Sequence, residues 1–327
     1  MRWLVACLTA VLALGAGCSS EPAAESEPAA DQTATPSTDP TPTPTASATA
    51  DPSIAPDPIR RFDADRALRT VRDLAVGIGP RPATGPAYRE AASYVADALD
   101  TRGYAVRRES FPVPAGDSWG VPVEAGRSAN VVAEPSGFDP AAPYVLVGAH
   151  LDTVAVAPGA EDNASGVAVL LELARVLGAE GQVVLVAFGA EEPVGPGELH
   201  HFGSKHHVAE LSPPQRRNLA AMVSLDRVGV GDVVPLSHVE GTAPTLRDRL
   251  ARIAGRIGIA TSTSTDSASD HESFADAGFV AARVGSTPYA GYHSADDLPR
   301  FVGRDQLDRV GRLLTAWLRA SWTPRSR

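Results

Sequence analysis

The sequence predicts an α/β fold of three layers, in which a mostly parallel central sheet is covered by helices on both faces. Four apolar runs, at 144–149, 183–188, 220–225 and 279–284, are typical of strands buried on both faces. Segments with helical spacing of apolar residues alternate with these runs along the chain. Such alternation indicates βα units, whose parallel strands pack between two layers of helices.

The individual elements follow from the spacing of apolar residues and from the positions of proline and glycine. Apolar residues three or four apart predict helices, and short apolar runs bounded by proline or glycine predict strands. Gly103, for example, closes a helical pattern. In chain order we expect helices around 68–74 and 88–99, short strands at 104–111 and 128–134, and, between and after the four apolar runs, helices over 164–177, 246–257 and 307–317.

The N-terminal segment 1–18 resembles a bacterial lipoprotein signal peptide. Arg2 precedes an apolar stretch, 3–16, that is too short to span a membrane comfortably. Small residues then lead to Cys18, so we expect cleavage before Cys18 and attachment of lipid to its thiol. Gly15 stands where leucine is usual, and an ordinary secretory signal is the alternative. Either reading predicts export, as a membrane-anchored surface lipoprotein or as a secreted protein.

Residues 19–59 predict a disordered tether between this signal and a single catalytic domain at 60–327. The segment consists almost entirely of Ala, Pro, Thr, Ser, Asp and Glu, and it has seven acidic residues and no basic one. It therefore buries too little apolar surface to offset its ordering entropy. The net charge of −10 argues against nucleic acid as a partner, and the lipid anchor would be the only contact with a membrane. Both cysteines precede residue 19, so the domain forms no internal disulfide.

Side chains that can bind metal ions follow three of the predicted strands. His150 comes directly after the run at 144–149, the pair Glu191–Glu192 follows 183–188, and Asp226 follows 220–225. Because the carboxyl ends of parallel strands meet at one edge of a sheet, these side chains should lie close together. Two residues in loops complete the set, namely Asp162 and His293. Two histidines and four carboxylates suffice to bind two metal ions and to leave one carboxylate as a base.

Each of these motifs alone has a simpler interpretation. His150 with Asp152 could be a hydrogen-bonded pair, Asp162 could cap a helix, and the Glu pair could be solvated. The joint occurrence, with three motifs at strand ends, favours a metal site. The remaining histidines are interpreted as surface residues or as residues without an identified partner, and they are His200, His201, His206, His207 and His238.

As a set, these motifs resemble the di-zinc aminopeptidase family, the secreted bacterial zinc aminopeptidases that share a fold with glutaminyl cyclases. The resemblance covers about residues 63–322 and includes IGPRPATGPAYREAASYVADAL, SANVVAE, GSKHHV and SDHESFADAG. It implies a zinc-exopeptidase fold of the phosphorylase/hydrolase-like type. The chain departs from the family at 193–202, which looks like an insertion beside the predicted site.

The resemblance also implies a role for each site residue, with two Zn²⁺ ions per chain. Asp162 would bridge the ions and precede a cis peptide bond to Asn163, while Glu191 would be the general base. Zinc binds imidazole nitrogen and carboxylate oxygen, and an adjacent carboxylate that binds no metal can move the proton of water. The resemblance further implies that His150 and Asp226 bind one ion and that Glu192 and His293 bind the other. Asp152 would support His150 without binding metal, and Tyr292 would help to stabilise the oxyanion.

The implied activity is hydrolysis of the N-terminal peptide bond of peptides with a free N-terminus. One alternative is a glutaminyl cyclase, although cyclases of this superfamily use one zinc ion and this chain has all five ligands of a two-zinc site. A second is an inactive surface-anchored binding protein. A third is a zinc exopeptidase that acts on the C-terminus, for which Arg227 or Arg283 would have to bind a carboxylate. Asp270 and His271 are candidates for residues that contact the metal ligands without binding metal themselves. Phe274 would either line a hydrophobic substrate pocket or pack in the core beneath a helix.

Overall fold

The computed structural model describes residues 61–322, with the side chain of Trp322 excluded. The signal peptide, the tether and Cys18 lie outside the described residues, so those predictions stay predictions. No helix within 61–322 is long and apolar enough to cross a membrane.

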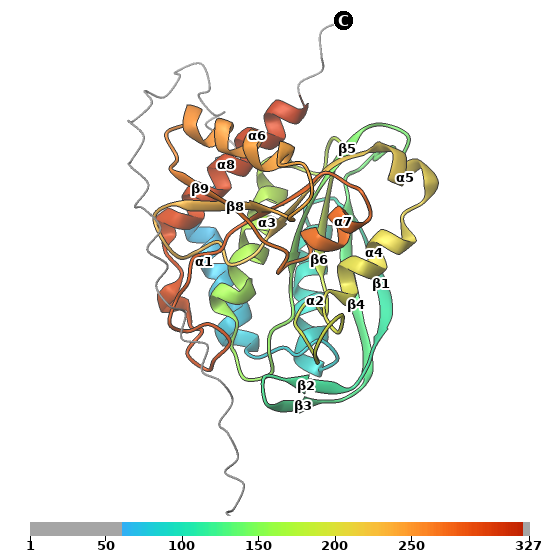
Figure 1. The fold of residues 1–327 in the computed structure, drawn as a ribbon, viewed down its shortest axis with the longest axis vertical. Helices are drawn as coiled ribbons and strands as arrows, with labels where there is room; N and C mark the ends of the chain where they lie inside the picture. The colour runs from blue at the N-terminus through green and yellow to red at the C-terminus, as the bar shows by residue number, and fades with distance from the viewer. Residues whose placement is uncertain (1–60, 323–327) are drawn as a thin grey trace, which may run out of the picture. The chain divides into compact units, whose positions relative to one another are not determined.

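The described chain alternates between helices and strands for most of its length (Figure 1). Its helices are α1 (Ala64–Arg72), the π-helical turn η2 (Asp73–Ile78), α2 (Pro86–Asp100), the π-helical turn η3 (Ala160–Ser165), α3 (Gly166–Leu177), α4 (Phe202–Glu210), α5 (Pro213–Asn218), α6 (Thr245–Arg256), α7 (His271–Asp276), the 3₁₀ turn η4 (Pro299–Phe301) and α8 (Arg304–Trp322). Its strands are β1 (Ala105–Val113), β2 (Gly116–Ser118), β3 (Val121–Val123), β4 (Gly126–Glu134), β5 (Tyr144–His150), β6 (Val183–Phe188), β7 (Leu219–Leu225), β8 (Val234–His238), β9 (Thr261–Thr265) and β10 (Ala281–Val284).

The central sheet has the strand order β1-β4-β6-β5-β7-β10-β8-β9. Its middle strands β6, β5, β7 and β10 run parallel, and β8 and β9 are also parallel to each other. Antiparallel pairings join β1 to β4, β4 to β6 and β10 to β8. The parallel centre has its carboxyl ends at one edge, where β5 ends at His150 and pairs it with Phe188 at the end of β6.

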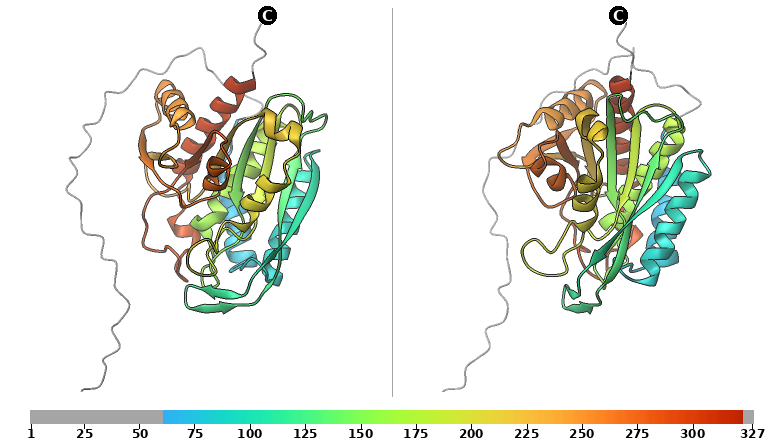
Figure 2. Two further views of the ribbon diagram at one scale, coloured as in Figure 1. Left: turned by 45° about the vertical axis from the view of Figure 1, so that its right-hand side comes forward. Right: turned by 90° about the vertical axis from the view of Figure 1, so that its right-hand side faces the viewer.

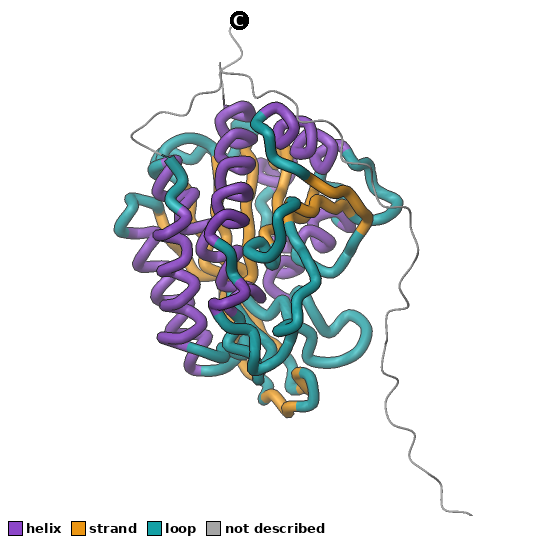
Figure 3. Tube along the Cα trace, turned by 90° about the vertical axis from the view of Figure 1, so that its left-hand side faces the viewer, coloured by secondary structure: helices purple, strands orange, loops and turns teal. Residues whose placement is uncertain are grey.

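Helices cover both faces of this sheet (Figure 2). On one face α1, α2, α3 and α8 form a layer, which Figure 3 shows in front of the strands. On the other face α4 and α7 pack together against the sheet. Successive side chains of β5 point into different cores, since Leu146 contacts the α7 side with Phe274, while Val147 contacts the α3 side. This double burial explains the continuous apolar runs.

The predicted fold class is confirmed, with a small two-stranded hairpin, β2 and β3, outside the main sheet. All four apolar runs are strands, and each predicted helix is present within a few residues of its expected bounds. Phe274 is fully buried in the core behind the sheet and therefore does not line a pocket. Within the described residues, the sequence analysis did not anticipate β8, β9, α4, α5 or the hairpin, and it interpreted the histidines of α4 as surface loop residues.

Candidate metal centre

The structure brings together all six predicted metal-site and base residues at the carboxyl edge of the parallel strands. His150 is the last residue of β5, Asp226 directly follows β7, and the Glu191–Glu192 pair follows β6. Asp162 lies in the turn η3 before α3. His293 comes from the loop after β10 and has a positive φ of 50°.

Asp162 lies between the two histidines and offers a different oxygen to each. Its Oδ1 is 3.1 Å from His150 Nε2, and its Oδ2 is 3.1 Å from His293 Nε2. A second carboxylate completes each side, with Asp226 Oδ1 at 3.6 Å from His150 Nε2 and Glu192 Oε2 at 3.3 Å from His293 Nε2. Two groups of donors are therefore joined by one carboxylate.

These separations fit ligands that share metal ions. Two ligands on one tetrahedral zinc ion lie about 3.3 Å apart, given metal–ligand bonds of about 2.0–2.1 Å. The donor set of imidazole nitrogen and carboxylate oxygen is also one that zinc prefers. Moreover, Glu192 Oε1 and Asp226 Oδ1 are buried without a hydrogen-bond partner, which would be costly unless a cation were bound. The residues present thus fit a metal pair.

The electrostatics of the cluster indicate an excess of buried negative charge. Burial, and then the charge of Asp162, raise the pKa of Glu192 to about 8. Burial opposes the charged form of His293, but hydrogen bonds to Asp162 and Glu192 raise its pKa to about 10. For Asp162 the hydrogen bonds from both histidines outweigh burial and lower its pKa. A cluster with this much buried negative charge favours the binding of divalent cations.

Asp152 supports the site through a different atom from the one expected. Its carboxylate accepts hydrogen bonds from the backbone N–H groups of Glu191 and Glu192, at 3.0 and 3.1 Å. The Nδ1 of His150 is 3.2 Å from the backbone oxygen of Asp152 and 3.9 Å from its carboxylate. The side chain of Asp152 therefore fixes the turn that carries the Glu pair, while its main chain orients His150.

Two further buried residues, which the sequence analysis did not single out, hold the turn around Asp162. The carboxylate of Asp297 accepts from the backbone N–H groups of Glu161 and Asp162, at 2.9 and 3.0 Å. The guanidinium of Arg81 donates to the backbone oxygens of Leu151 and Gly159, at 2.7 and 2.9 Å. Arg81 thereby links the segment after β5 to the turn that carries the bridging carboxylate.

Asn163, which follows Asp162, is also held in place. The peptide bond between Asp162 and Asn163 is cis, as the resemblance implied. The side chain of Asn163 donates to Leu225 O at 2.8 Å and accepts from the backbone N–H of Arg227 at 3.2 Å. It therefore joins the turn of Asp162 to the end of β7, next to Asp226.

Arg283 is part of this support and is not available to a substrate. Its side chain is 1% exposed and lies 2.9 Å from Asp226 Oδ2, and it also contacts Asp266. Burial opposes ionisation of Asp226, but the charge of Arg283 holds its pKa well below the usual range. Arg283 therefore cannot bind a substrate carboxylate, as the alternative of a C-terminal exopeptidase would require, because Asp226 and Asp266 already pair with its guanidinium.

A cleft with an empty volume of about 770 Å³ opens over the metal centre. Aromatic rings form one wall, where Tyr292 stacks on His293 at 3.7 Å and Trp119 meets the same imidazole at 4.4 Å. The guanidinium of Arg227 lies over the Tyr292 ring at 4.3 Å. Tyr292 and Trp119 are 41% and 55% exposed, so this wall is accessible to a ligand.

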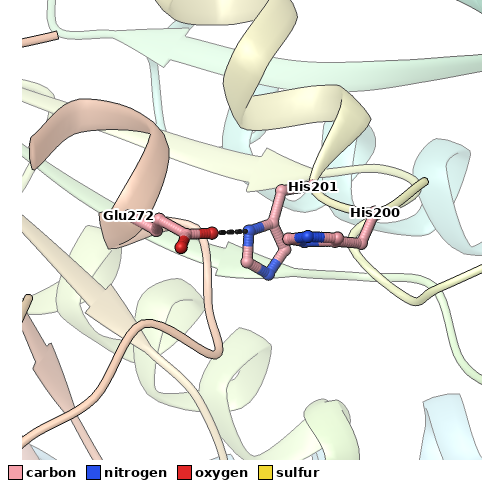
Figure 4. Close-up of side chains that lie close together, drawn as sticks. All are labelled: His200, His201 and Glu272. Atoms are coloured by element: carbon pink, nitrogen blue, oxygen red, sulfur yellow. Dashed lines mark ion pairs between the residues drawn. The ribbon is translucent and has the colours of Figure 1, made fainter. Parts of the chain in front are cut away.

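Two histidines that were predicted to lie on the surface are buried, and that prediction is wrong for both. His201 is 4% exposed, and it contacts Glu272 (Figure 4) and also Glu191. His207 is 2% exposed, and its Nδ1 is 2.8 Å from Glu109 on β1. Sequence spacing gave no sign of these contacts, because Glu272 and Glu109 lie on α7 and β1, and Glu191 meets His201 only through the folding of their common loop.

The other histidines are partly or largely enclosed as well. His200 and His206 are half-buried, and the ring of His206 lies 5.1 Å from that of Phe111. His238 has a partner after all, since its Nδ1 lies 3.1 Å from Arg247 Nη1.

Asp270 and His271 are both fully buried behind the site. Burial, and then the charge of Glu191, raise the pKa of Asp270 to about 7. The Nε2 of His271 lies 2.8 Å from the backbone oxygen of Asp266, whose side chain contacts Arg283.

Comparisons with known proteins agree with this geometry. Peptidase family M28 matches residues 130–318. The aminopeptidase YwaD of Bacillus subtilis is 31% identical over 186 residues, which are 53% of this chain and 40% of that protein. Leupeptin-inactivating enzyme 1 of Streptomyces exfoliatus is 27% identical, and the match covers 50% of the length of that enzyme. This chain thus spans about half the length of these relatives.

Solved structures share the fold at low sequence identity. BSAP, a zinc aminopeptidase from Bacillus subtilis, superposes with a TM-score of 0.72 at 20% identity, over 82% of this chain and 97% of that one. The glutaminyl cyclase of Porphyromonas gingivalis superposes with a TM-score of 0.66 at 23% identity, over 80% and 99%. The family match covers more than half of the sequence and contains all the candidate ligands. The chain therefore belongs to peptidase family M28.

Proposed function

We propose that this protein is a two-zinc aminopeptidase that hydrolyses the N-terminal peptide bond of peptides. The observation that carries the proposal is the two-sided position of Asp162, with one oxygen 3.1 Å from His150 and the other 3.1 Å from His293. A carboxylate that faces two separate donor groups is what two adjacent metal ions require. Membership of family M28 supports the same reaction class.

In this proposal two zinc ions would be held by Asp162 together with two flanking pairs of residues. His150 and Asp226 complete one site, and Glu192 and His293 complete the other. When bound, the ions would supply Lewis-acid chemistry at the scissile carbonyl and make a water molecule acidic enough to lose a proton near neutral pH.

Glu191 is the general base of the proposed reaction. Its backbone N–H is fixed by Asp152, and its Oε2 is 3.9 Å from His150 Nε2, so its carboxylate faces the metal centre. It would take a proton from the attacking water and pass it to the leaving amine. Tyr292, at the wall of the cleft, would donate to the developing oxyanion. Acidic groups of the centre would attract the free amine of the substrate.

A glutaminyl cyclase is the second candidate, because a solved cyclase shares the fold. The two activities are separated by mass spectrometry of peptides incubated with the zinc-loaded protein. The mixture contains peptides with free N-termini, the same peptides acetylated, and one peptide with N-terminal glutamine. We expect loss of one residue from free N-termini only. Loss of ammonia from the glutamine peptide alone would identify a cyclase, and no change in any peptide would favour an inactive binding protein.

We further propose that the protein is exported and anchored by lipid at Cys18, with its substrates outside the cytoplasm. This proposal rests on the segment 1–18 alone, in which an arginine, an apolar stretch and small residues precede the cysteine.

A further inference from the structure

His201 lies between two carboxylates, one of which belongs to the proposed base. Its Nε2 is 3.2 Å from Glu191 Oε1, and its Nδ1 is 3.1 Å from Glu272 Oε2. Figure 4 shows the imidazole edge turned toward Glu272, on the far side from His200. The contact with Glu272 is a close ion pair and not a well-aligned hydrogen bond. Glu191, His201 and Glu272 thus form one continuous chain of polar contacts.

The backbone delivers His201 to this position. The segment 193–200 leaves the sheet after the Glu pair, and two hydrogen bonds close it at its base. His201 N donates to Glu191 O at 3.0 Å, and Phe202 N donates to Ala190 O at 2.8 Å. Ala190 and His201 both have a φ of 54°, a left-handed conformation that is unfavourable for a residue with a Cβ. The folding of the segment 193–202 therefore places His201 opposite the carboxylate of Glu191.

The arrangement makes His201 a buried cation. The carboxylates of Glu191 and Glu272 face the two ring nitrogens and favour the protonated form of the imidazole. Burial opposes this charge, but the contacts with Glu191 and Glu272 raise the pKa of His201 to about 10. Since His201 is 4% exposed, the charge depends on both carboxylates. Loss of Glu272 would therefore weaken the hold of His201 on Glu191.

A third metal ion at His200, His201 and Glu272 is a less suitable explanation, although their donor atoms lie within 4.8 Å of one another. The rings of His200 and His201 meet edge-on, at 4.0 Å and 85°. His200 and Glu272 lie on opposite sides of the His201 ring in Figure 4. The imidazole of His201 thus stands between the other two side chains and already pairs with Glu272, which favours a bridging role for it over a shared metal ion.

Glu191 needs such a restraint because it lies close to one of the metal sites. Its Oε2 is 3.9 Å from His150 Nε2, and Glu191, His150 and Asp226 together could hold an ion. A base that became a ligand would lose its capacity to accept a proton. We propose that His201, held by Glu272, is a positioning residue that keeps the carboxylate of Glu191 off the metal and directed at the substrate. This inference rests on the proposed aminopeptidase function.

The test compares His201→Ala, His201→Gln and Glu272→Ala in the zinc-loaded full-length protein. His201→Ala should lower kcat by about 10–100-fold, a part of the roughly 10²–10⁴-fold that general acid–base catalysis contributes, with KM and zinc content nearly unchanged. His201→Gln should retain more activity, because its amide can donate to Glu191 in place of Nε2. His206→Ala, in the helix α4 that begins directly after His201 but outside the cleft, is the matched control and should behave like wild type.

A double-mutant cycle separates positioning from a general structural effect. If Glu272 acts through His201, Glu272→Ala lowers kcat in the wild type but adds little in the His201→Ala background. Unchanged kcat in His201→Ala, additive effects in the cycle, or loss of zinc from the variants would each overturn the inference. If His201→Ala fails to fold by circular dichroism, the same cycle is made with His201→Leu, which fills the site without a hydrogen-bond donor, and Glu272→Gln.

A readout that does not need turnover keeps this inference separate from the proposed function. Crystal structures of zinc-loaded wild type and His201→Ala should show the Glu191 carboxylate moved toward the metal centre in the variant. An unmoved carboxylate would contradict the inference even if the wild type hydrolyses peptides. Conversely, an inactive wild type would refute the proposed function, while a displaced Glu191 would still support the positioning role.

Discussion

Glu109→Gln should destabilise the fold by an amount that depends on pH. Glu109, on β1, accepts from His207 Nδ1 at 2.8 Å and from Asn130 Nδ2 at 3.1 Å, and it also contacts Arg107. Burial would raise the pKa of this carboxyl, but the hydrogen bond and charge of His207, with help from Arg107 and Asn130, lower it to about 2. The pair ties the sheet to α4, the helix that begins next to His201.

The magnitude follows from linkage between protonation and folding. The unfolded value is 4.5, so the folded value of about 2 corresponds to a contribution on the order of 3 kcal/mol. Because the folded pKa is the lower one, the contribution is complete above about pH 4.5 and is lost as the pH falls through 2. We expect Glu109→Gln to cost about 2–3 kcal/mol at pH 7 and less than about half of that near pH 3.

Urea denaturation at pH 7, 5, 4 and 3 measures this difference. Any loss of metal at low pH affects both proteins alike and cancels in the comparison. Glu134→Gln is the matched control, since Glu134 is 25% exposed and lies 3.6 Å from Arg107, and it should cost less than about 1 kcal/mol. A cost for Glu109→Gln below about 0.5 kcal/mol at pH 7, or one that does not change with pH, would refute the reasoning.

Three further predictions concern the metal centre and the N-terminus. Glu191→Gln should lower kcat by about 10²–10⁴-fold, because it removes the proposed base, while zinc stays bound because every proposed ligand remains. Activity assays and metal analysis measure both quantities, and loss of zinc from the variant would contradict the assignment. Chelation should lower the melting temperature, since Asp162, Glu192 and Asp226 would lose their cations; zinc at a hundredfold excess over Kd is worth about 2.7 kcal/mol, and an unchanged melting curve would argue against a metal site. Cys18→Ser should abolish labelling by a fatty-acid analogue and release the protein from membranes, and persistent labelling would rule out this lipid site.

The fold could be predicted because its central strands carry a strong signal. Strands buried on both faces have continuous apolar runs, and the helices that cover them have clear apolar stripes. The edge of the sheet gave no such signal. Strand β9 (Thr261–Thr265) consists of alternating threonine and serine and contains no apolar residue, and β8 has a proline at its second position. Their pairing depends on neighbours far away in sequence.

The candidate ligands could be predicted because parallel strands deliver their ends to one edge. The residues that support these ligands and the neighbouring helix could not be predicted, because their hydrogen-bond partners lie on other elements. Asp297 binds the backbone of Asp162 from 135 positions away, and His207 binds Glu109 from 98 positions away. His201 had one usable signal, because it stands at the end of the insertion, directly before α4. Its contact with Glu191 could not be predicted, because the contact forms only when the segment 193–200 folds back and closes through backbone hydrogen bonds.

The most direct test of the two-metal centre is a crystal structure of the zinc-loaded protein with anomalous scattering at the zinc edge. We predict two zinc ions per chain, one on each side of Asp162, and no zinc bond to Glu191. The expected ligands are His150 and Asp226 on one ion, Glu192 and His293 on the other, and Asp162 on both. A single ion, or two ions of which only one contacts Asp162, would contradict the account.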